Sequence, residues 1–268
     1  MSEDEKAKER WDNEGGHPLK SKMRTGQIIS MSKITELNAL ITNKLLARLP
    51  GKEYRRLFPS LENVALNYGE HVYERGDVID DVYFPSSGIV SLLTTVENSG
   101  TLEVGIIGNE GMLGLSVFLG VKTSNNRAVI QGEGSAMKLK SRDFLKECSL
   151  GGALPKILRR FTHSLLTQIS QSAFCFRFHT VEARLARWLL MSSDRMESNE
   201  FPITQDFLAN MLGVRREAVN KSAVILQDSK LIEYSRGKMH ILDHSKLEKS
   251  SCPCYAIIKT EEQSLTLN

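Results

Sequence analysis

The sequence lacks the features that mark a membrane or secreted protein. It contains no run of about eighteen apolar residues, which a membrane-spanning helix requires, and its first residues (MSEDEKAKER) are charged, unlike a secretory signal. Its four cysteines are scattered and match neither a disulfide framework nor paired CxxC zinc ligands. We therefore expect a cytoplasmic protein in a reducing compartment.

Enzyme signatures are also missing. The sequence has no GxSxG turn, no Gly-rich phosphate loop with Lys and no HExxH pair. The histidines are too scattered to form a metal-ligand set by spacing, so a metal-dependent cupin is a weak alternative and no metal or cofactor is predicted. Cys252 and Cys254 form a CxC pair without a third ligand nearby. We interpret them as two thiols of a tail, against the alternative of a redox or metal pair.

The composition is that of a soluble globular chain with room for two domains. Of the 268 residues, 41% are hydrophobic and 25% are charged, and the net charge of +3 neither requires nor excludes nucleic acid. The predicted organisation is a flexible tail (1–35), a β-rich sensor domain (36–150), a connecting helix (151–179), a DNA-binding domain (180–250) and a C-terminal tail (251–268).

Hydrophobic periodicity changes along the chain. Residues 37–57 predict short helices, whereas residues 61–139 alternate with period two (VYFPSSGIVSLLTTV, TLEVGII, RAVIQ and SAMKLK) and predict a small β barrel or sandwich. Gly132-Glu133-Gly134 is expected to form a tight turn. The helical period returns at residues 154–175 and again in VEARLARWLLM, which is followed by SSDRMESNEFP as a linker.

The helix predicted at residues 154–175 has one narrow apolar stripe, which resembles a coiled-coil seam. We favour a dimer helix because it lies between two domains. Packing against the chain's own β domain is the alternative. The stripe consists of Leu154, Leu158, Phe161, Leu165 and Ile169.

Residues 203–243 (ITQDFLANMLGVRREAVNKSAVILQDSKLIEYSRGKMHILD) have the pattern of a winged helix-turn-helix. Thr204 is a good N-cap, so a first helix is expected to begin at Gln205. Gly213 supplies a left-handed residue for a sharp turn, and a second helix is expected from about Arg215. The residues expected to be buried are Leu208, Met211 and Leu212 in the first helix and Val219, Ala223 and Leu226 in the second.

The second helix is typical of a recognition helix, because its exposed face carries residue types that read base edges in the major groove. From residue 214 to residue 240, six Lys or Arg stand against three Asp or Glu. Ser222 departs from the pattern, since such helices usually bury an aliphatic residue there. The expected face consists of Arg215, Arg216, Glu217, Asn220 and Lys221.

The segment LIEYSRGKMHILD predicts a basic hairpin, a wing that binds phosphate through Arg236 and Lys238. Thr204 and Gln205, at the start of the first helix, complete the expected DNA contacts. An ordinary helical hairpin with a solvated charged face is the alternative. The cap, the Gly turn, the basic helix and the basic hairpin together favour a DNA reader.

Residues 37–247 resemble the Crp/Fnr superfamily of bacterial transcription factors. RGDVIDDVYFPSSGIVSL matches the family's turn and strand pattern, with Gly76, Tyr83 and Gly88 in place, and ITQDFLANMLGVRREAV matches its reading head. The resemblance implies an α+β fold: a cyclic-nucleotide-binding-like β-roll (jelly roll), a long dimerisation helix and a C-terminal winged helix-turn-helix.

The same resemblance implies a homodimer that reads pseudo-palindromic double-stranded DNA, with RNA polymerase as a further partner. It puts Arg216, Glu217 and Lys221 at the family's base-contacting positions. A ligand-binding module whose winged helix docks a protein is the alternative. Salt dependence separates the two, because DNA binding weakens steeply as salt rises.

The family's phosphate-binding cassette corresponds to GMLGLSVFLGVKTSNNRAVIQ (residues 111–131). Cyclic-nucleotide binders have Glu after the first Gly and an Arg-Ser pair late in the loop, whereas this chain has Met112 and Asn126-Arg127. Cyclic AMP is therefore not the expected effector, although Arg127 could bind another anion, and no effector is assigned. The candidate effector pocket consists of Gly111, Met112, Leu113, Gly114, Asn126 and Arg127.

Overall fold

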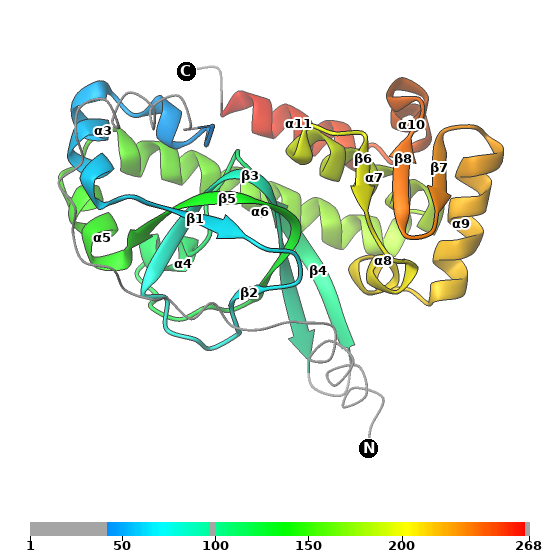
Figure 1. Cartoon of the computed structure of the whole chain (residues 1–268), viewed down its shortest axis with the longest axis horizontal. Helices are drawn as coiled ribbons and strands as arrows, with labels where there is room; N and C mark the ends of the chain where they lie inside the picture. The colour runs from blue at the N-terminus through cyan, green and yellow to red at the C-terminus, as the bar shows by residue number, and fades with distance from the viewer. Residues whose placement is uncertain (1–41, 97–99, 266–268) are drawn as a thin grey trace. The chain divides into compact units, whose positions relative to one another are not determined.

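The computed structural model describes residues 42–96 and 100–265. The predicted N-terminal tail (1–35) and the start of the predicted helical segment at 37–57 lie outside the described residues. The chain divides into two compact units, and Figure 1 labels the helices and strands. The first contains the described residues up to Val90 together with Ile107–Leu158, and the second contains Ser91–Ile106 and the described residues from Arg159 onward.

The first unit is built around antiparallel strands. β1 and β2 both pair with β5 in antiparallel fashion. Alternating apolar residues turn one side of each strand into a core, so that Val82, Phe84 and Ile130 are fully buried. The elements are η1 (Leu46–Arg48), α3 (Gly51–Leu57), η2 (Phe58–Ser60), β1 (Glu62–Leu66), β2 (His71–Tyr73), β3 (Asp81–Val96), α4 (Leu115–Phe118), β5 (Arg127–Lys140) and α5 (Ser141–Ser149).

The prediction of a tight turn at Gly132-Glu133-Gly134 is wrong, because β5 runs through these residues as one strand. The glycines serve close approach between strands instead. A Cβ atom on Gly134 would lie 2.3 Å from the carbonyl oxygen of Ser87, and one on Gly88, whose φ is +82°, would lie 2.5 Å from the carbonyl oxygen of Gly132.

The second unit combines helices with a small sheet. Its elements are β4 (Gly100–Ile107), most of α6 (Ala153–Phe178), α7 (Val181–Met196), β6 (Glu200–Pro202), α8 (Gln205–Leu212), α9 (Arg216–Asp228), β7 (Ile232–Ser235), β8 (Lys238–Ile241), α10 (His244–Ser250) and α11 (Cys254–Ser264). The side chain of Gln168 on α6 pairs with both backbone groups of Ile106, which fixes β4 against this helix. The predicted α+β fold, a β-sheet domain followed by helices and a winged helix-turn-helix, is confirmed.

The apolar stripe of α6 is the inner face of the helix. Leu154, Leu158, Phe161 and Leu165 are buried within the single chain, and only Ile169 is half-buried. Burial by the chain itself favours the alternative stated above, packing against the chain's own domain, while the role of α6 as a dimer helix stays a prediction. The helix itself was expected.

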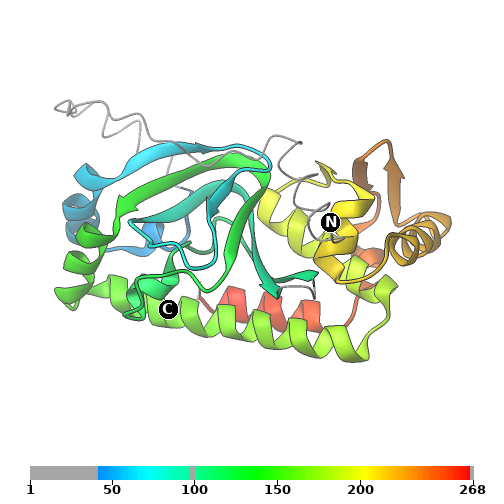
Figure 2. The same ribbon diagram turned by 90° about the horizontal axis from the view of Figure 1, so that it is seen from below.

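Two segments expected to be irregular are ordered. SSDRMESNEFP is not a linker: α7 continues to Met196, and Glu200–Pro202 is a strand paired with β8. Residues 254–264 are not a tail but the helix α11, whose Tyr255 and Ile258 are buried. Figure 2 shows α11, in red, running along α6, in green, where His163 and Glu261 pair at 2.9 Å. None of the described helices is long and apolar enough to cross a membrane.

Candidate nucleic-acid interface

The first helix of the motif, α8, is fixed by local chemistry at both ends. The Thr204 hydroxyl accepts a hydrogen bond from the Phe207 amide at 3.1 Å, which confirms the predicted start at Gln205. At the other end Gly213 has φ +60°, and the Val214 amide donates to the Ala209 carbonyl at 3.0 Å. The predicted burial of Leu208, Met211 and Leu212 is confirmed.

The second helix, α9, begins at Arg216, one residue later than expected, and Arg215 is its extended N-cap. Val219, Ala223 and Leu226 are buried as predicted, and Ser222 is buried beside them. All five residues predicted to face outward are exposed: Arg215, Arg216, Glu217, Asn220 and Lys221. The helix therefore packs with one side and presents a charged side to solvent.

Gln205 joins the two helices on this exposed side. Its amide nitrogen donates to Asn220 Oδ1 at 3.0 Å, and its Oε1 accepts from Arg216 Nε at 3.2 Å. Arg216 also lies 3.6 Å from Asp206 in an exposed ion pair. Exposed pairs of this kind contribute only about 0–1 kcal/mol. Gln205, Asn220 and Arg216 are thus held in position by contacts weak enough to exchange for a ligand.

The wing is a hairpin with a two-residue turn. Ser235 pairs with Lys238, and the turn residues Arg236 and Gly237 have φ +49° and φ +75°. Positive φ at both positions is typical of the type I′ turn that suits the twist of a hairpin. The side chains of Arg236 and Lys238 are exposed at this tip.

The wing is anchored close to the start of α8. The Ile203 amide donates to the Gly237 carbonyl at 2.8 Å, and the Tyr234 hydroxyl donates to the Ile203 carbonyl at 3.0 Å. Burial raises the pKa of Tyr234 above its ordinary value, which lies well above neutral pH, and the hydroxyl is therefore protonated and donates. We call the exposed face of α9, the start of α8 and the wing tip the reading surface. It consists of Thr204, Gln205, Arg215, Arg216, Glu217, Asn220, Lys221, Arg236 and Lys238.

The cassette residues lie together in the first unit but present little polar chemistry. Met112 and Leu113 are fully buried, and Gly114, with φ +85°, lies so close to Val82 that a Cβ atom would be 3.0 Å from its Cγ1. Gly111 is also buried, and its carbonyl accepts from the Asn43 side chain at 2.9 Å. This half of the cassette is a packing element.

Arg127, the one cation proposed for an anionic effector, is engaged within the chain. Its Nε donates to Glu74 Oε2 at 2.7 Å, while His71 Nδ1 lies 2.7 Å from the other oxygen of the same carboxylate. Burial opposes ionisation of Glu74, but the hydrogen bonds from His71 and Arg127 outweigh it and lower the pKa of this carboxyl group. Asn126 lies beside Arg127 and is half-buried.

Comparison with known families accounts for both parts of the chain. Residues 64–149 match the model of the cyclic nucleotide-binding domain, and residues 183–250 match that of the Crp-like helix-turn-helix domain. The chain belongs to the Crp/Fnr family of transcription regulators. No curated protein sequence matches it at a significant level.

Solved structures share the fold of this Crp/Fnr chain at low sequence identity. A putative crp/fnr-family regulator from Eubacterium rectale is 17% identical, with a TM-score of 0.61 over 77% of this chain and 96% of that one. FixK2 from Bradyrhizobium japonicum is 14% identical, with a TM-score of 0.62 over 72% and 98%. The c-di-GMP-responsive regulator CLP from Xanthomonas campestris is 18% identical, with a TM-score of 0.59 over 72% and 100%.

Sequence reasoning missed three contributors to the Crp/Fnr reading head. Asp206 pairs with Arg216, Tyr234 anchors the wing, and β6 adds a third strand to it. The apolar Phe201 after the charged Glu200 was the available signal for β6, and the structure buries Phe201 between the exposed Glu200 and Pro202. The contact made by Tyr234 depends on the fold and has no sequence signal.

Proposed function

We propose that the chain is a sequence-specific transcription regulator that acts in the cytoplasm as a homodimer on a pseudo-palindromic operator, controlled through its β-roll by an effector other than cyclic AMP. The observation that carries the proposal is the reading surface. It joins the exposed face of α9 and its N-cap, where three cations stand against one carboxylate, to a basic wing tip, while the opposite side of α9 is buried. RNA polymerase is the expected further partner at a promoter.

Within this proposal the residues of the reading surface divide by chemistry. Arg216 and Lys221 suit guanine, Asn220 suits adenine, and Glu217 accepts from cytosine. Arg215, Arg236 and Lys238 suit phosphate, and Thr204 and Gln205 lie at a helix N-terminus, where backbone amides attract anions. Gln205 releases Arg216 when a base takes its place.

The dimer contact is proposed on the outer face of α6. Leu166, Phe174 and Phe178 are 58%, 50% and 63% exposed and lie on one side of the second-unit part of the helix. Apolar residues that recur along one exposed helix face favour a helix partner, here a second copy. A two-fold pair would set its recognition helices about 34 Å apart, one turn of DNA.

The effector proposal follows from the cassette. Met112 is buried where a nucleotide binder has a carboxylate for the ribose, and Arg127 is paired with Glu74. Binding a cyclic nucleotide phosphate would require breaking that pair without the ribose contact in return. A different ligand, or a β-roll that serves structure alone, agrees better with these contacts.

The decisive experiment is selection from a random DNA pool followed by fluorescence anisotropy across a salt titration. We expect enrichment of a two-fold symmetric site and an affinity that falls steeply with salt, because cations on the protein displace condensed counterions. Cell extract added in a parallel selection supplies a missing effector. Binding that is absent in both arms, or insensitive to salt, would overturn the proposal and favour a winged helix that docks a protein.

A further inference from the structure

Three cysteines and a histidine lie close together where the end of α6 meets the start of α11. Cys175 lies in the last turn of α6 and His179 directly follows that helix, while Cys252 precedes α11 and Cys254 begins it. One donor atom from each of the four lies within 4.8 Å of all the others. We call this group the Cys-His cluster. It brings together segments that are about 75 residues apart in the sequence.

The dimensions of the Cys-His cluster suit a single ion. Zinc–sulfur bonds of about 2.3 Å in a tetrahedron put neighbouring sulfur ligands about 3.8 Å apart. Here the sulfur atoms of Cys175 and Cys252 are 3.3 Å apart, and Cys254 Sγ lies 3.6 Å from His179 Nδ1. An iron–sulfur cluster binds its cysteines through different iron atoms and needs a wider cage. The spacing therefore favours a mononuclear centre.

The backbone conformation orients the ligand atoms of the Cys-His cluster toward one another. Cys175 and His179 are four residues apart, and the His179 amide donates to the Cys175 carbonyl at 3.1 Å, so both side chains project from the same helical turn. Across from them, the Tyr255 amide donates to the Cys252 carbonyl at 3.1 Å, which curls the CxC segment. The three thiols are buried, and His179 is half-buried.

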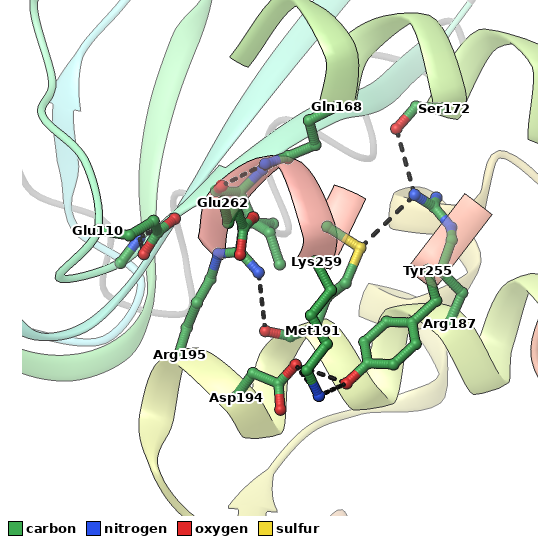
Figure 3. A network of polar contacts seen from close by, with 12 residues as sticks. Glu110, Gln168, Ser172, Arg187, Met191, Asp194, Arg195, Tyr255, Lys259 and Glu262 are labelled. Atoms are coloured by element: carbon green, nitrogen blue, oxygen red, sulfur yellow. Dashed lines mark hydrogen bonds and ion pairs between the residues drawn. The ribbon is translucent and has the colours of Figure 1, made fainter. Parts of the chain in front are cut away.

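The charge around the cluster also favours a metal–thiolate centre. A divalent ion with three thiolates and a neutral imidazole has a net charge of −1. Arg187, on α7, is buried nearby and interacts electrostatically with Cys175, Cys252 and Cys254. Its guanidinium donates to Ser172 Oγ at 3.4 Å and Met191 Sδ at 3.6 Å (Figure 3) and forms no ion pair among the residues described. Arg187 also interacts electrostatically with the buried Glu103, and a negatively charged centre would add further counter-charge to this buried cation.

We propose that Cys175, His179, Cys252 and Cys254 bind one divalent ion of the zinc class, which fastens the start of α11 to the end of α6. The matched helix-turn-helix domain ends at residue 250, so the CxC ligands lie beyond it. Polar contacts hold α11 to α7, and one of them, Tyr255 with Asp194 at 2.7 Å, lies directly beside Cys254 (Figure 3). The ion would join this same end of α11 to α6 as well.

The test uses the full-length chain, purified under reducing conditions with zinc supplied and then dialysed against buffer. We expect about one zinc per chain by elemental analysis. Co²⁺ added to the chelator-treated protein should give thiolate-to-cobalt charge-transfer absorption and the intense visible bands of a tetrahedral site. Chelation should lower the melting temperature of the protein, because the binding energy of a structural ion contributes to folding.

Variants locate the site. Cys252→Ser and His179→Ala should lose the bound zinc or shift the cobalt spectrum, whereas Cys148→Ser, which changes the cysteine outside the cluster, should retain both. If a variant does not fold, the cobalt spectrum of the wild-type protein still tests whether a tetrahedral thiolate site is present. Wild-type protein that takes up neither ion would overturn the proposal, as would a Cys175–Cys252 disulfide found by mass spectrometry in place of bound metal.

Discussion

The cassette and the reading surface differ in how the chain treats its polar side chains. In the cassette, Arg127 is paired with Glu74 and Met112 is buried, so the chain's own contacts use up the groups that could meet a ligand. On the reading surface the charged groups are exposed, and Arg216 is held only by exposed partners, Gln205 and Asp206. A group satisfied internally stabilises the fold, whereas a weakly held one remains available for binding.

The largest expected effect concerns backbone packing in the β-roll. Gly134→Ala should lower the free energy of unfolding by about 3 kcal/mol or more, because its Cβ would meet backbone atoms of Ser87 and Gly88 that have no room to move. On the reading surface, Gly237→Ala should lower the free energy of unfolding by about 1–2 kcal/mol. Only the positive φ of this residue opposes the change, because the added Cβ would lie 3.8 Å from its nearest neighbour, the Ile203 carbonyl oxygen. Urea denaturation of both variants measures this difference, and equal losses would contradict it.

The next largest effect is a dependence of the unfolding free energy on pH, which arises from Glu103 in the second unit. Burial raises the pKa of Glu103 to about 7, against hydrogen bonds from Ser91 and Trp188 that favour its ionised form. A raised pKa stabilises the fold below the ordinary value near 4.5, and this contribution is lost as pH rises through 7. The loss amounts to about 3 kcal/mol.

Glu103→Gln isolates this contribution. The variant should show a flatter dependence of unfolding free energy on pH between about 4.5 and 8 than the wild type. Glu133→Gln, a change in a carboxylate exposed on β5, serves as the control and should leave the slope unchanged. Identical slopes in wild type and Glu103→Gln would show that Glu103 ionises normally.

A smaller effect divides the reading surface itself. Arg216→Ala should cost about 1–3 kcal/mol of discrimination at one base pair, because it removes a base-edge contact. Lys238→Ala should weaken binding to all sequences alike and reduce the slope of log affinity against log salt by about 1. Selection and salt titration of both variants measure these changes. Unaltered base preference in Arg216→Ala would remove that residue from base readout.

The smallest effect is expected in the cassette. Arg127→Ala should change the free energy of unfolding by about 1 kcal/mol or less, because the Arg127–Glu74 pair is partly exposed. Cyclic AMP should shift the melting temperature of neither the wild type nor this variant. A thermal shift in the wild type that Arg127→Ala abolishes would show that the cassette binds the nucleotide after all.

The sequence predicted the features that depend on local chemistry. The start of α8 at Gln205 follows from the Thr204 cap, and the turn after α8 follows from Gly213 with its positive φ. The period-two pattern located the strands, and the helical period located α6 and α7. These signals lie within a few residues of the structure that they specify, so they can be read without the fold.

Features that depend on distant contacts were missed. The stripe on α6 was assigned to a partner because periodicity reveals an apolar face but not what covers it. Gly134 was read as a turn because a sequence does not show that another strand passes close by. Cys252 and Cys254 had no apparent ligand partners because Cys175 and His179 are about 75 residues away. Each case concerns tertiary proximity.

The hydrogen bond between Trp188 and Glu103 gives the molecule an internal optical reporter. The chain has two tryptophans, and the other, Trp11, lies outside the described residues. The Trp188 indole N–H donates to the Glu103 carboxyl group at 2.8 Å and its ring packs edge-on against Phe201 of β6, at a centroid distance of 6.5 Å. In a Trp11→Phe background, indole emission would therefore report on β4, α7 and the strand that supports the wing without any added dye.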